Sequence, residues 1–347
     1  MFELVLLTIG LALVFDFYNG MNDAANSIAT VVSTRILTPR QAVAWAAFWN
    51  FVAAFVFGTA VAKSIHSGIL KIDSVSQMLV LAALVGAIAW THACTHWGMP
   101  ISVSHALIGG LIGAGLVRAG FDLGVLQLAR IGKVGLFIFL APLLGLAGGM
   151  VLMVVVYRLF HRATPGRVDR VFRTGQLLSA AAFSLGHGAN DAQKTMGIMT
   201  MALAACADTR HLVARAGEFH VPYWVVLSAH AAIAIGTLVG GARVIRTMGS
   251  RLTKLKPAQG FCAEGAAAVL LFGTAYAGIP VSTTHTITGS IMGVGAVKRW
   301  KAVRWGVAKR IVWAWVLTIP CAAIVSGLAY ALLDLFGLVR WAEGGVG

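Results

Sequence analysis

Charged residues are scarce in this chain, and acidic residues are the scarcest. Only 11% of the 347 residues are charged, 59% are hydrophobic, and the mean hydropathy is +0.84. A soluble globular domain carries about 25% charged residues, so water cannot be the only solvent of this protein. Apolar stretches recur along the whole chain and leave no room for a separate soluble domain.

Recognisable catalytic and metal-binding patterns are also missing. The four cysteines, Cys94, Cys206, Cys262 and Cys321, show neither a metal-binding spacing nor a disulfide framework. The chain contains no H-E-x-x-H and no G-x-S-x-G motif. An intramembrane enzyme with two aspartates as its acid pair therefore remains only a weak alternative. We predict that the protein is not an enzyme and has no cofactor.

The formal net charge of +15 comes from basic residues that lie in short gaps between apolar runs. A nucleic-acid binder needs such residues on a solvated face, so we expect no nucleic-acid partner. Of the 27 Lys and Arg residues, 18 lie in the alternate connections 28–41, 158–173, 243–256 and 298–310. The positive-inside rule then makes these connections cytoplasmic and both termini extracytoplasmic, in a bacterial inner membrane or a plasma membrane.

The apolar runs predict an all-α polytopic protein within the lipid bilayer. We expect three parts: a first transmembrane repeat at 1–157, a basic cytoplasmic connection at 158–175 and a second transmembrane repeat at 176–347. The expected spans are 4–27, 42–62, 78–97, 100–117, 134–157, 176–200, 222–242, 260–277, 280–297 and 308–334.

Two sequence blocks occur twice in the chain. Residues 20–27 and 188–195 share G-x-N-D-A, while 98–115 and 278–295 share G-x-P-x-S-x-x-H-x-x-x-G-x-x-x-G-x-G. Five spans in each half, an odd number, would make the second copy enter the membrane from the opposite side. Inverted repeats of this kind place a binding site near the bilayer midplane.

Each copy of the first block carries an aspartate in an apolar span. Burying an ionised carboxylate there costs at least ~2.5 kcal/mol, which demands compensation. Neighbouring asparagines offer amide oxygens suited to Na⁺, and a proton would neutralise the acid instead. A polar network joining helices is the alternative. The cation-coupling candidates are Asn22, Asp23, Asn26, Asn190 and Asp191, with Asp23 and Asp191 as metal ligands if the cation is Na⁺.

The second block is typical of a helix start. Gly98 and Gly278 permit a turn, and Pro100 and Pro280 suit the first helical position. Free N–H groups, the helix dipole and hydroxyls would converge there as an oxyanion site, although a helix that begins after a loop explains one copy equally well. The substrate-binding candidates are Ser102, Ser104, Ser282, Thr283 and Thr284.

Apart from Lys309 and Arg310 at the very start of the last predicted span, Lys194 is the only Lys or Arg within a predicted span, and it follows Asp191 by three residues. It either reaches the anion or forms a structural ion pair. His105 and His285 follow the two serines and remain possible site residues, as does Glu264 for coupling. The other polar residues in apolar surroundings we interpret as packing groups: Asp16, Asn50, His92 and His230.

At these motifs the chain resembles the PiT family of inorganic phosphate transporters. The matching segments are G-M-N-D-A-A-N-S at 20–27, P-I-S-V-S-H at 100–105, G-H-G-A-N-D-A-Q-K-T at 186–195 and P-V-S-T-T-H at 280–285. Small residues around the acids would allow close helix approach or broken helices. The resemblance implies re-entrant hairpins, a homodimer, and symport of phosphate, in some bacterial members as a metal-phosphate complex, with Na⁺ or H⁺. It also implies that Gln193 joins the Ser/Thr turns in substrate binding, together with Asn22, Asp23, Asn190 and Asp191. Lys194 and Thr195 are two further substrate-binding candidates.

One position departs from the family pattern. The first hydroxyl turn reads Ser102-Val103-Ser104 where the family commonly has Ser-Thr-Thr. The missing hydroxyl leaves open a permease for sulfate or another oxyanion. An anion channel that uses the same pore is the other alternative.

Overall fold

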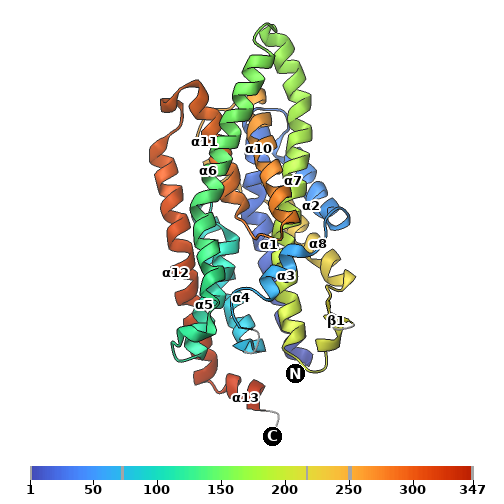
Figure 1. The fold of residues 1–347 in the computed structure, drawn as a ribbon, viewed down its shortest axis with the longest axis vertical. Coiled ribbons are helices and arrows are strands. Elements are labelled where there is room, and N and C mark those ends of the chain that lie inside the picture. Colours follow the sequence, from blue (N-terminus) through green and yellow to red (C-terminus); the bar gives the residue numbers. More distant parts are fainter. Residues whose placement is uncertain (1, 72–73, 216–217, 249–251, 345–347) are drawn as a thin grey trace.

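The computed structural model describes residues 2–71, 74–215, 218–248 and 252–344, and Arg251, counted above among the cytoplasmic basic residues, lies outside them. This part of the chain is almost entirely helical, with the long helices aligned along one axis (Figure 1). The only paired strands in it are the short β1 (Ala214–Arg215) and β2 (Glu218–Phe219).

The first half contains α1 (Phe2–Ser33), α2 (Pro39–Val52), η1 (Ala53–Phe55), α3 (Ala60–His66), α4 (Gln77–Trp97), α5 (Val103–Arg118), η3 (Leu123–Val125) and α6 (Leu128–Leu159). The second half contains α7 (Pro165–Ala204), η4 (Arg210–Leu212), α8 (Tyr223–Val239), α9 (Ala242–Arg246), α10 (Pro257–Tyr276), α11 (Thr283–Lys298), η6 (Trp300–Ala302), α12 (Trp305–Leu335) and α13 (Leu338–Gly344).

The predicted all-α membrane architecture is confirmed. Within the described residues, α1, α4, α6, α10 and α12 are long and apolar enough to span a bilayer. The span expected at 42–62 is broken instead, because the helix of α2 and η1 meets α3 at an angle of 83°. Helices α5 and α8 are apolar but shorter.

Corresponding helices of the two halves run in opposite directions. In Figure 1, α1 and α6 rise from the end that holds both termini, whereas α7 and α12 descend towards it. The hairpin of α4 and α5 lies nearer the termini, and the hairpin of α10 and α11 lies nearer the opposite end (Figure 1).

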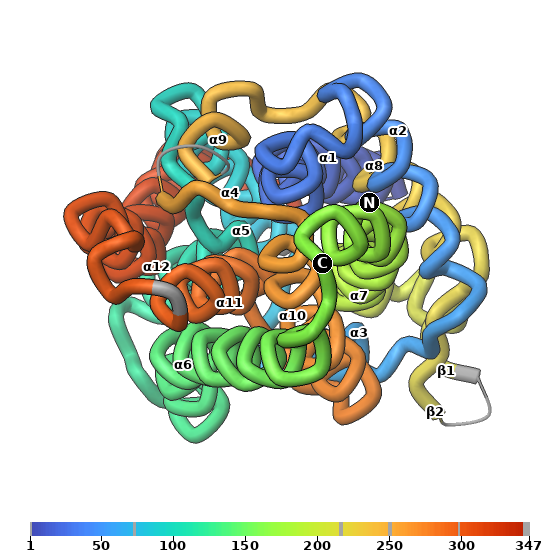
Figure 2. Tube along the Cα trace, turned by 90° about the horizontal axis from the view of Figure 1, so that it is seen from above, coloured from blue at the N-terminus to red at the C-terminus, as the bar shows by residue number. Residues whose placement is uncertain are grey.

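Glycines allow the short helices to pack closely against partners from the other half. A Cβ at Gly113 of α5 would collide with the backbone of Ala323 in α12, and a Cβ at Gly293 of α11 would collide with Leu146 in α6. Small residues serve helix approach in this way within membranes. Seen from above, α6 and α12 lie at the periphery (Figure 2), and their apolar windows are only 22% and 28% buried, which leaves their outer faces for lipid.

One local prediction was wrong. Pro100 and Pro280 do not occupy the first helical turns, because α5 begins at Val103 and α11 at Thr283. Of the two alternatives for the small residues around the acids, broken helices are not found, because α1 and α7 continue unbroken through the two G-x-N-D-A blocks. The small residues of these blocks serve close packing instead: a Cβ at Gly20 would collide with the backbone of Ile233 on α8.

Candidate functional site

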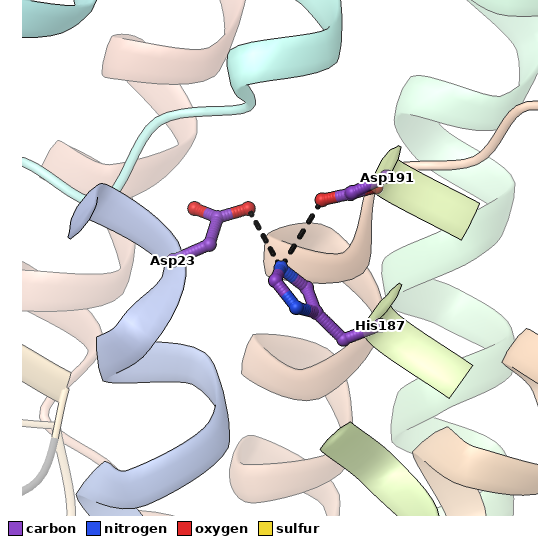
Figure 3. Close-up of side chains that lie close together, drawn as sticks. All are labelled: Asp23, His187 and Asp191. Carbon is purple, nitrogen blue, oxygen red and sulfur yellow. Dashed lines mark ion pairs between the residues drawn. The ribbon is translucent and has the colours of Figure 1, made fainter. Parts of the chain in front are cut away.

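Two aspartates from different halves of the chain meet inside the protein. Asp23 on α1 and Asp191 on α7 face each other with His187 between them (Figure 3). His187 Nε2 lies 3.2 Å from Asp191 Oδ2 and 3.7 Å from Asp23 Oδ2. All three side chains are at most 3% exposed. We call these three residues the acid pair and its histidine.

The helices fix this arrangement in simple ways. His187 and Asp191 are four residues apart, which places them on one face of α7. Gly188 lies against the backbone of Asn50 on α2, so α7 approaches α2 closely. Asn50 Oδ1 then lies 3.0 Å from His187 Nδ1, and the amide of Asn50 donates to Thr237 Oγ1 at 3.0 Å.

Both predicted helix starts reach the neighbourhood of the acid pair. Ser102 and Ser282 are the N-caps of α5 and α11, and each side chain accepts from the backbone N–H three residues later at 3.3 Å. The next residue on α11, Thr283, places its hydroxyl 3.2 Å from Asp23 Oδ2 and 3.1 Å from Asp191 Oδ2. The positive end of α11 therefore points at the carboxylates, where a helix start favours negative charge.

The two helix starts also touch each other. Thr284 on α11 donates to the carbonyl of Ile101 at 2.9 Å, and it accepts from Asn26 Nδ2 at 2.9 Å. One turn further on, the rings of His105 and His285 pack edge to face with centroids 4.9 Å apart, and His285 stacks on Trp315. Both histidines therefore pack behind the helix starts, and no described contact joins them to the carboxylates.

Lys194 is buried with three acceptors around its ammonium group. Its Nζ lies 2.5 Å from Asp191 Oδ1, 2.5 Å from Ser104 Oγ and 2.7 Å from the carbonyl of Val281. It thus links α7 to both helix starts. The ion-pair and anion-site interpretations of Lys194 are compatible, since Ser104 is one of the predicted substrate residues.

Several predicted residues have other contacts in this state. Gln193 accepts from the N–H groups of Val61 and Ala62, which caps the first turn of α3. Asn22 donates to Thr95 at 2.7 Å, and Asn190 donates to carbonyls of its own helix and of α10. Thr195 lies one turn beyond Asp191 and has no hydrogen-bond partner for its hydroxyl.

Glu264 belongs to a separate buried network. Its carboxylate accepts from Thr30, from Ser179 at 2.5 Å and from Gln176 at 3.2 Å. Three donors satisfy this acid where it stands, between α1, α7 and α10.

Two matched hydroxyl contacts were not predicted from the sequence. Ser64 on α3 donates to the carbonyl of Gly278 at 2.6 Å, and Thr247, which caps α9, donates to the carbonyl of Gly98 at 3.0 Å. Gly98 and Gly278 both have positive φ and end α4 and α10 ahead of the two helix starts. We call these contacts the Ser64 latch and the Thr247 latch.

A cavity adjoins the Ser64 latch. Its volume is about 590 Å³, and its lining includes Ser64, Gly278 and Pro280 together with the basic residues Arg130 and Lys133 at the start of α6. In Figure 1 this start of α6 lies towards the end of the molecule that holds the termini.

Comparison with known proteins agrees with this geometry. The model of the phosphate transporter family matches residues 19–326, which include the acid pair, Lys194 and both helix starts. This chain belongs to the phosphate transporter family. The predicted PiT membership is therefore confirmed, and members of this family are multi-pass transporters rather than enzymes.

Several known proteins resemble this chain over nearly its whole length. A probable low-affinity inorganic phosphate transporter of Rhizobium meliloti (strain 1021) is 51% identical over 334 residues, 96% of this chain and 98% of its own length. A protein of the same description from Bacillus subtilis (strain 168) is 40% identical over the same shares. The solved structure of "the sodium-dependent phosphate transporter" matches with a TM-score of 0.87 and 26% identity, over 96% of this chain and 99% of that one.

His187 is the central residue that the sequence did not single out. It stands in the block at 186–195, four residues before Asp191. The corresponding position of the first block is Asn19, so a comparison of the two repeats did not reveal His187. Its spacing to Asp191 was the available signal.

Proposed function

We propose that the protein is a symporter that carries inorganic phosphate together with Na⁺ or H⁺ through the site around the acid pair. One observation carries the proposal. The buried site holds two carboxylates, Asp23 and Asp191, whose partners are the Lys194 ammonium group and the His187 ring, which has an acceptor beside each of its nitrogens. A phosphate anion adds further negative charge to this acid pair, so its entry calls for a cation that enters with it.

The side chains beside the acid pair suit a small hard cation. One ligand atom from each of Asp23, His187 and Asp191 lies within 4.8 Å of the others. The amide oxygens of Asn22 and Asn190 are buried and have no hydrogen-bond partner. Carboxylate and amide oxygens are hard ligands, so this set fits Na⁺, while protonation of one acid would meet the same charge requirement.

Phosphate would then bind where positive groups already converge. Ser104, Thr283 and Lys194 surround the starts of α5 and α11, and the first N–H groups of each helix have no partner within the helix. Without the cation, Asp23 and Asp191 would repel the anion. Mutual dependence of this kind couples the two fluxes, because each ligand improves the affinity for the other.

Alternating access would use the two latches. Opposed directions of corresponding helices support an inverted repeat, in which the Ser64 latch and the Thr247 latch take equivalent places on opposite sides of the site. Both latches are closed here and the acid pair is buried, so this conformation is occluded. Opening one latch at a time would expose the site to one side only.

The distribution of basic residues supports one orientation of the protein in the membrane. We propose that the connections at 28–41, 158–173, 243–256 and 298–310 face the cytoplasm and that both termini are extracytoplasmic. The cavity with Arg130 and Lys133 then opens towards the extracytoplasmic side, where it would attract phosphate. A homodimer and transport of a metal-phosphate complex stay predictions from the family resemblance.

Uptake of labelled phosphate into proteoliposomes tests the function. We expect uptake driven by an inward Na⁺ or proton gradient, its loss in Asp23→Asn, and its retention in Asp208→Asn, a matched change in an exposed loop. Phosphate uptake that depends on neither gradient would refute coupling to Na⁺ or H⁺.

Competition and counterflow separate the alternatives. Stronger inhibition by sulfate than by unlabelled phosphate would instead identify a sulfate permease. A channel would show no counterflow of labelled phosphate, whereas a carrier must show it.

A further inference from the structure

A second buried acid lies on the same face of α1 as Asp23, two helical turns nearer the N-terminus. Asp16 precedes Asp23 by seven residues, which corresponds to about 10 Å along the axis. On the facing α7, Thr195 lies one turn beyond Asp191 in the same direction. Asp16, Asn19 and Thr195 are 0%, 2% and 0% exposed. We call them the Asp16 cluster.

This cluster is short of hydrogen bonds. The Asp16 carboxylate receives one donor, Asn19 Nδ2, at 3.3 Å from Oδ1. Its Oδ2 and the amide oxygen of Asn19 have no partner, and the Thr195 hydroxyl, which lies beside the carboxylate, makes no hydrogen bond of good geometry with it. The buried acid of the other network, Glu264, has three donors. A buried carboxylate with so few hydrogen-bond donors is costly to keep ionised.

No cation of the protein compensates Asp16. Within the described residues it forms no ion pair, and the charged or titratable side chains nearest it are His187 and Asp191 on α7, which are engaged with Asp23 and each other. On the other helices packed against this part of α1, His230 of α8 bonds to the carbonyl of Val226, and His92 of α4 packs on Tyr18.

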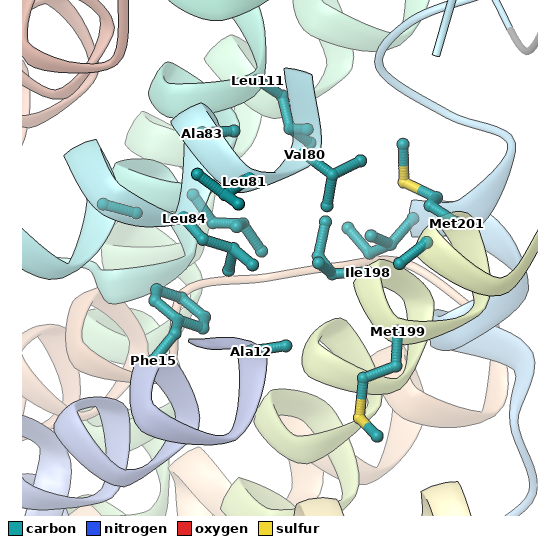
Figure 4. Close-up of a cluster of buried hydrophobic side chains, with 14 of the residues drawn as sticks. Ala12, Phe15, Val80, Leu81, Ala83, Leu84, Leu111, Ile198, Met199 and Met201 are labelled. Atoms are coloured by element: carbon teal, nitrogen blue, oxygen red, sulfur yellow. The ribbon is translucent and has the colours of Figure 1, made fainter. Parts of the chain in front are cut away.

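Solvent does not compensate it either. Ala12, one turn before Asp16, and Met199, one turn after Thr195, belong to the buried apolar cluster of Figure 4, with Phe15 and Ile198. This cluster closes the space between α1, α4 and α7 on the side of the termini. Asp16 is thus sealed from that end and lies between the apolar cluster and the acid pair.

We propose that Asp16 is a proton-binding site, distinct from the acid pair, that carries one proton through the transport cycle. Protonation converts the carboxylate to a neutral acid whose new O–H donates to an oxygen that now lacks a partner, Thr195 Oγ1 or Asn19 Oδ1. A metal ion fits less well, because α1 and α7 stay helical here and offer no free main-chain carbonyls. The packing role expected for Asp16 from the sequence is replaced by a titrating one.

The second half has no equivalent acid. The repeat that aligns Asp23 with Asp191 aligns Asp16 with Ser184, whose buried hydroxyl is also unpartnered. The proton site is therefore single and lies on the side of the acid pair nearer the termini. This inference rests on the proposed symport, since a coupled proton needs a transported partner.

Infrared spectroscopy tests the protonation without transport. Purified protein at neutral pH should show the carbonyl band of a buried carboxylic acid that disappears in Asp16→Asn and persists in Asp208→Asn. An unchanged band in a folded Asp16→Asn protein would overturn the proposal. If that variant does not fold, either Thr195→Val or Asn19→Leu should shift the same band by removing the acceptor of its O–H, and a band that is unshifted in both variants would have the same meaning.

Accumulation at steady state tests the coupling. Each coupled proton changes the phosphate accumulation ratio about tenfold per pH unit across the membrane. We expect Asp16→Asn to lose one such factor relative to Asp16→Glu and Asp208→Asn in the same proteoliposomes. A lost dependence on the Na⁺ gradient, or no change in either dependence, would overturn the proton site. Absence of uptake by the unaltered protein would instead refute the proposed function.

Discussion

Ser64 and Gly278 are 214 residues apart in the sequence, yet the serine hydroxyl donates a 2.6 Å hydrogen bond to the glycine carbonyl. The matching contact, from Thr247 to Gly98, spans 149 residues. In both cases a short helix of one half holds the glycine turn ahead of the helix start in the other half. Because both contacts join one half to the other, we expect relative movement of the halves to break one of them.

Loss of one latch should therefore bias the protein towards one open state. A hydrogen bond contributes about 1 kcal/mol, so removing it should raise the open population about fivefold. In Ser64→Ala, a cysteine at position 283 in a cysteine-free background should react faster with an impermeant thiol reagent added from the side of the termini. Thr247→Val should accelerate the reaction from the opposite side.

A matched change elsewhere checks the specificity of that effect. Ser228 bonds only to a carbonyl of its own helix, so Ser228→Ala should leave both rates unchanged. Equal acceleration from both sides in Ser64→Ala would contradict a one-sided latch.

The sequence predicted those parts of the site whose residues occur in both repeats. The pairing of Asp23 with Asp191 and the two capped helix starts followed from repeated motifs, since equivalent residues of inverted repeats meet at the centre. His187 and the latches have no duplicate in residue type: Asn19 corresponds to His187, and a serine corresponds to a threonine. Their roles depend on how closely α3 and α9 approach the opposite half, which local sequence does not encode.

The positions of Pro100 and Pro280 illustrate a different limit. Proline suits the first helical turn, but the serine two residues later offers a side-chain oxygen for the first free N–H groups. The serine cap decided where each helix begins, and each proline lies in the extended segment before it.

Lys194 should contribute to stability and be essential for transport. Lys194→Met leaves Asp191 buried without its cation, and loss of one partner of a buried pair costs about 3–5 kcal/mol. We expect a clearly lower unfolding temperature in detergent and no phosphate uptake. The double variant Lys194→Met with Asp191→Asn should recover much of the stability but none of the uptake, and equal stability of the single and double variants would contradict a buried ion pair.

Val103 stands where the resemblance to the PiT family leads us to expect a threonine. Its side chain is 1% exposed and packs in the large apolar cluster. Val103→Thr would bury a hydroxyl among apolar neighbours at a cost of about 1–3 kcal/mol. We expect a lower unfolding temperature with little change in the preference for phosphate over sulfate, measured by competition; a large change in that preference would show that residue 103 faces the anion.

Close helix packing across the halves can be tested with two glycines of similar sequence context. Gly113 of α5 has no room for a Cβ because the backbone of Ala323 on α12 occupies that space, whereas a Cβ at Gly132 of α6 would meet no atom within 4 Å. Gly113→Ala should force the helices apart and cost about 1–3 kcal/mol. Gly132→Ala should be neutral or stabilise by up to about 1 kcal/mol, because alanine favours the helix. Thermal unfolding of the purified variants measures both, and if Gly113→Ala were as stable as Gly132→Ala, α5 and α12 would not be packed as closely as the structure places them.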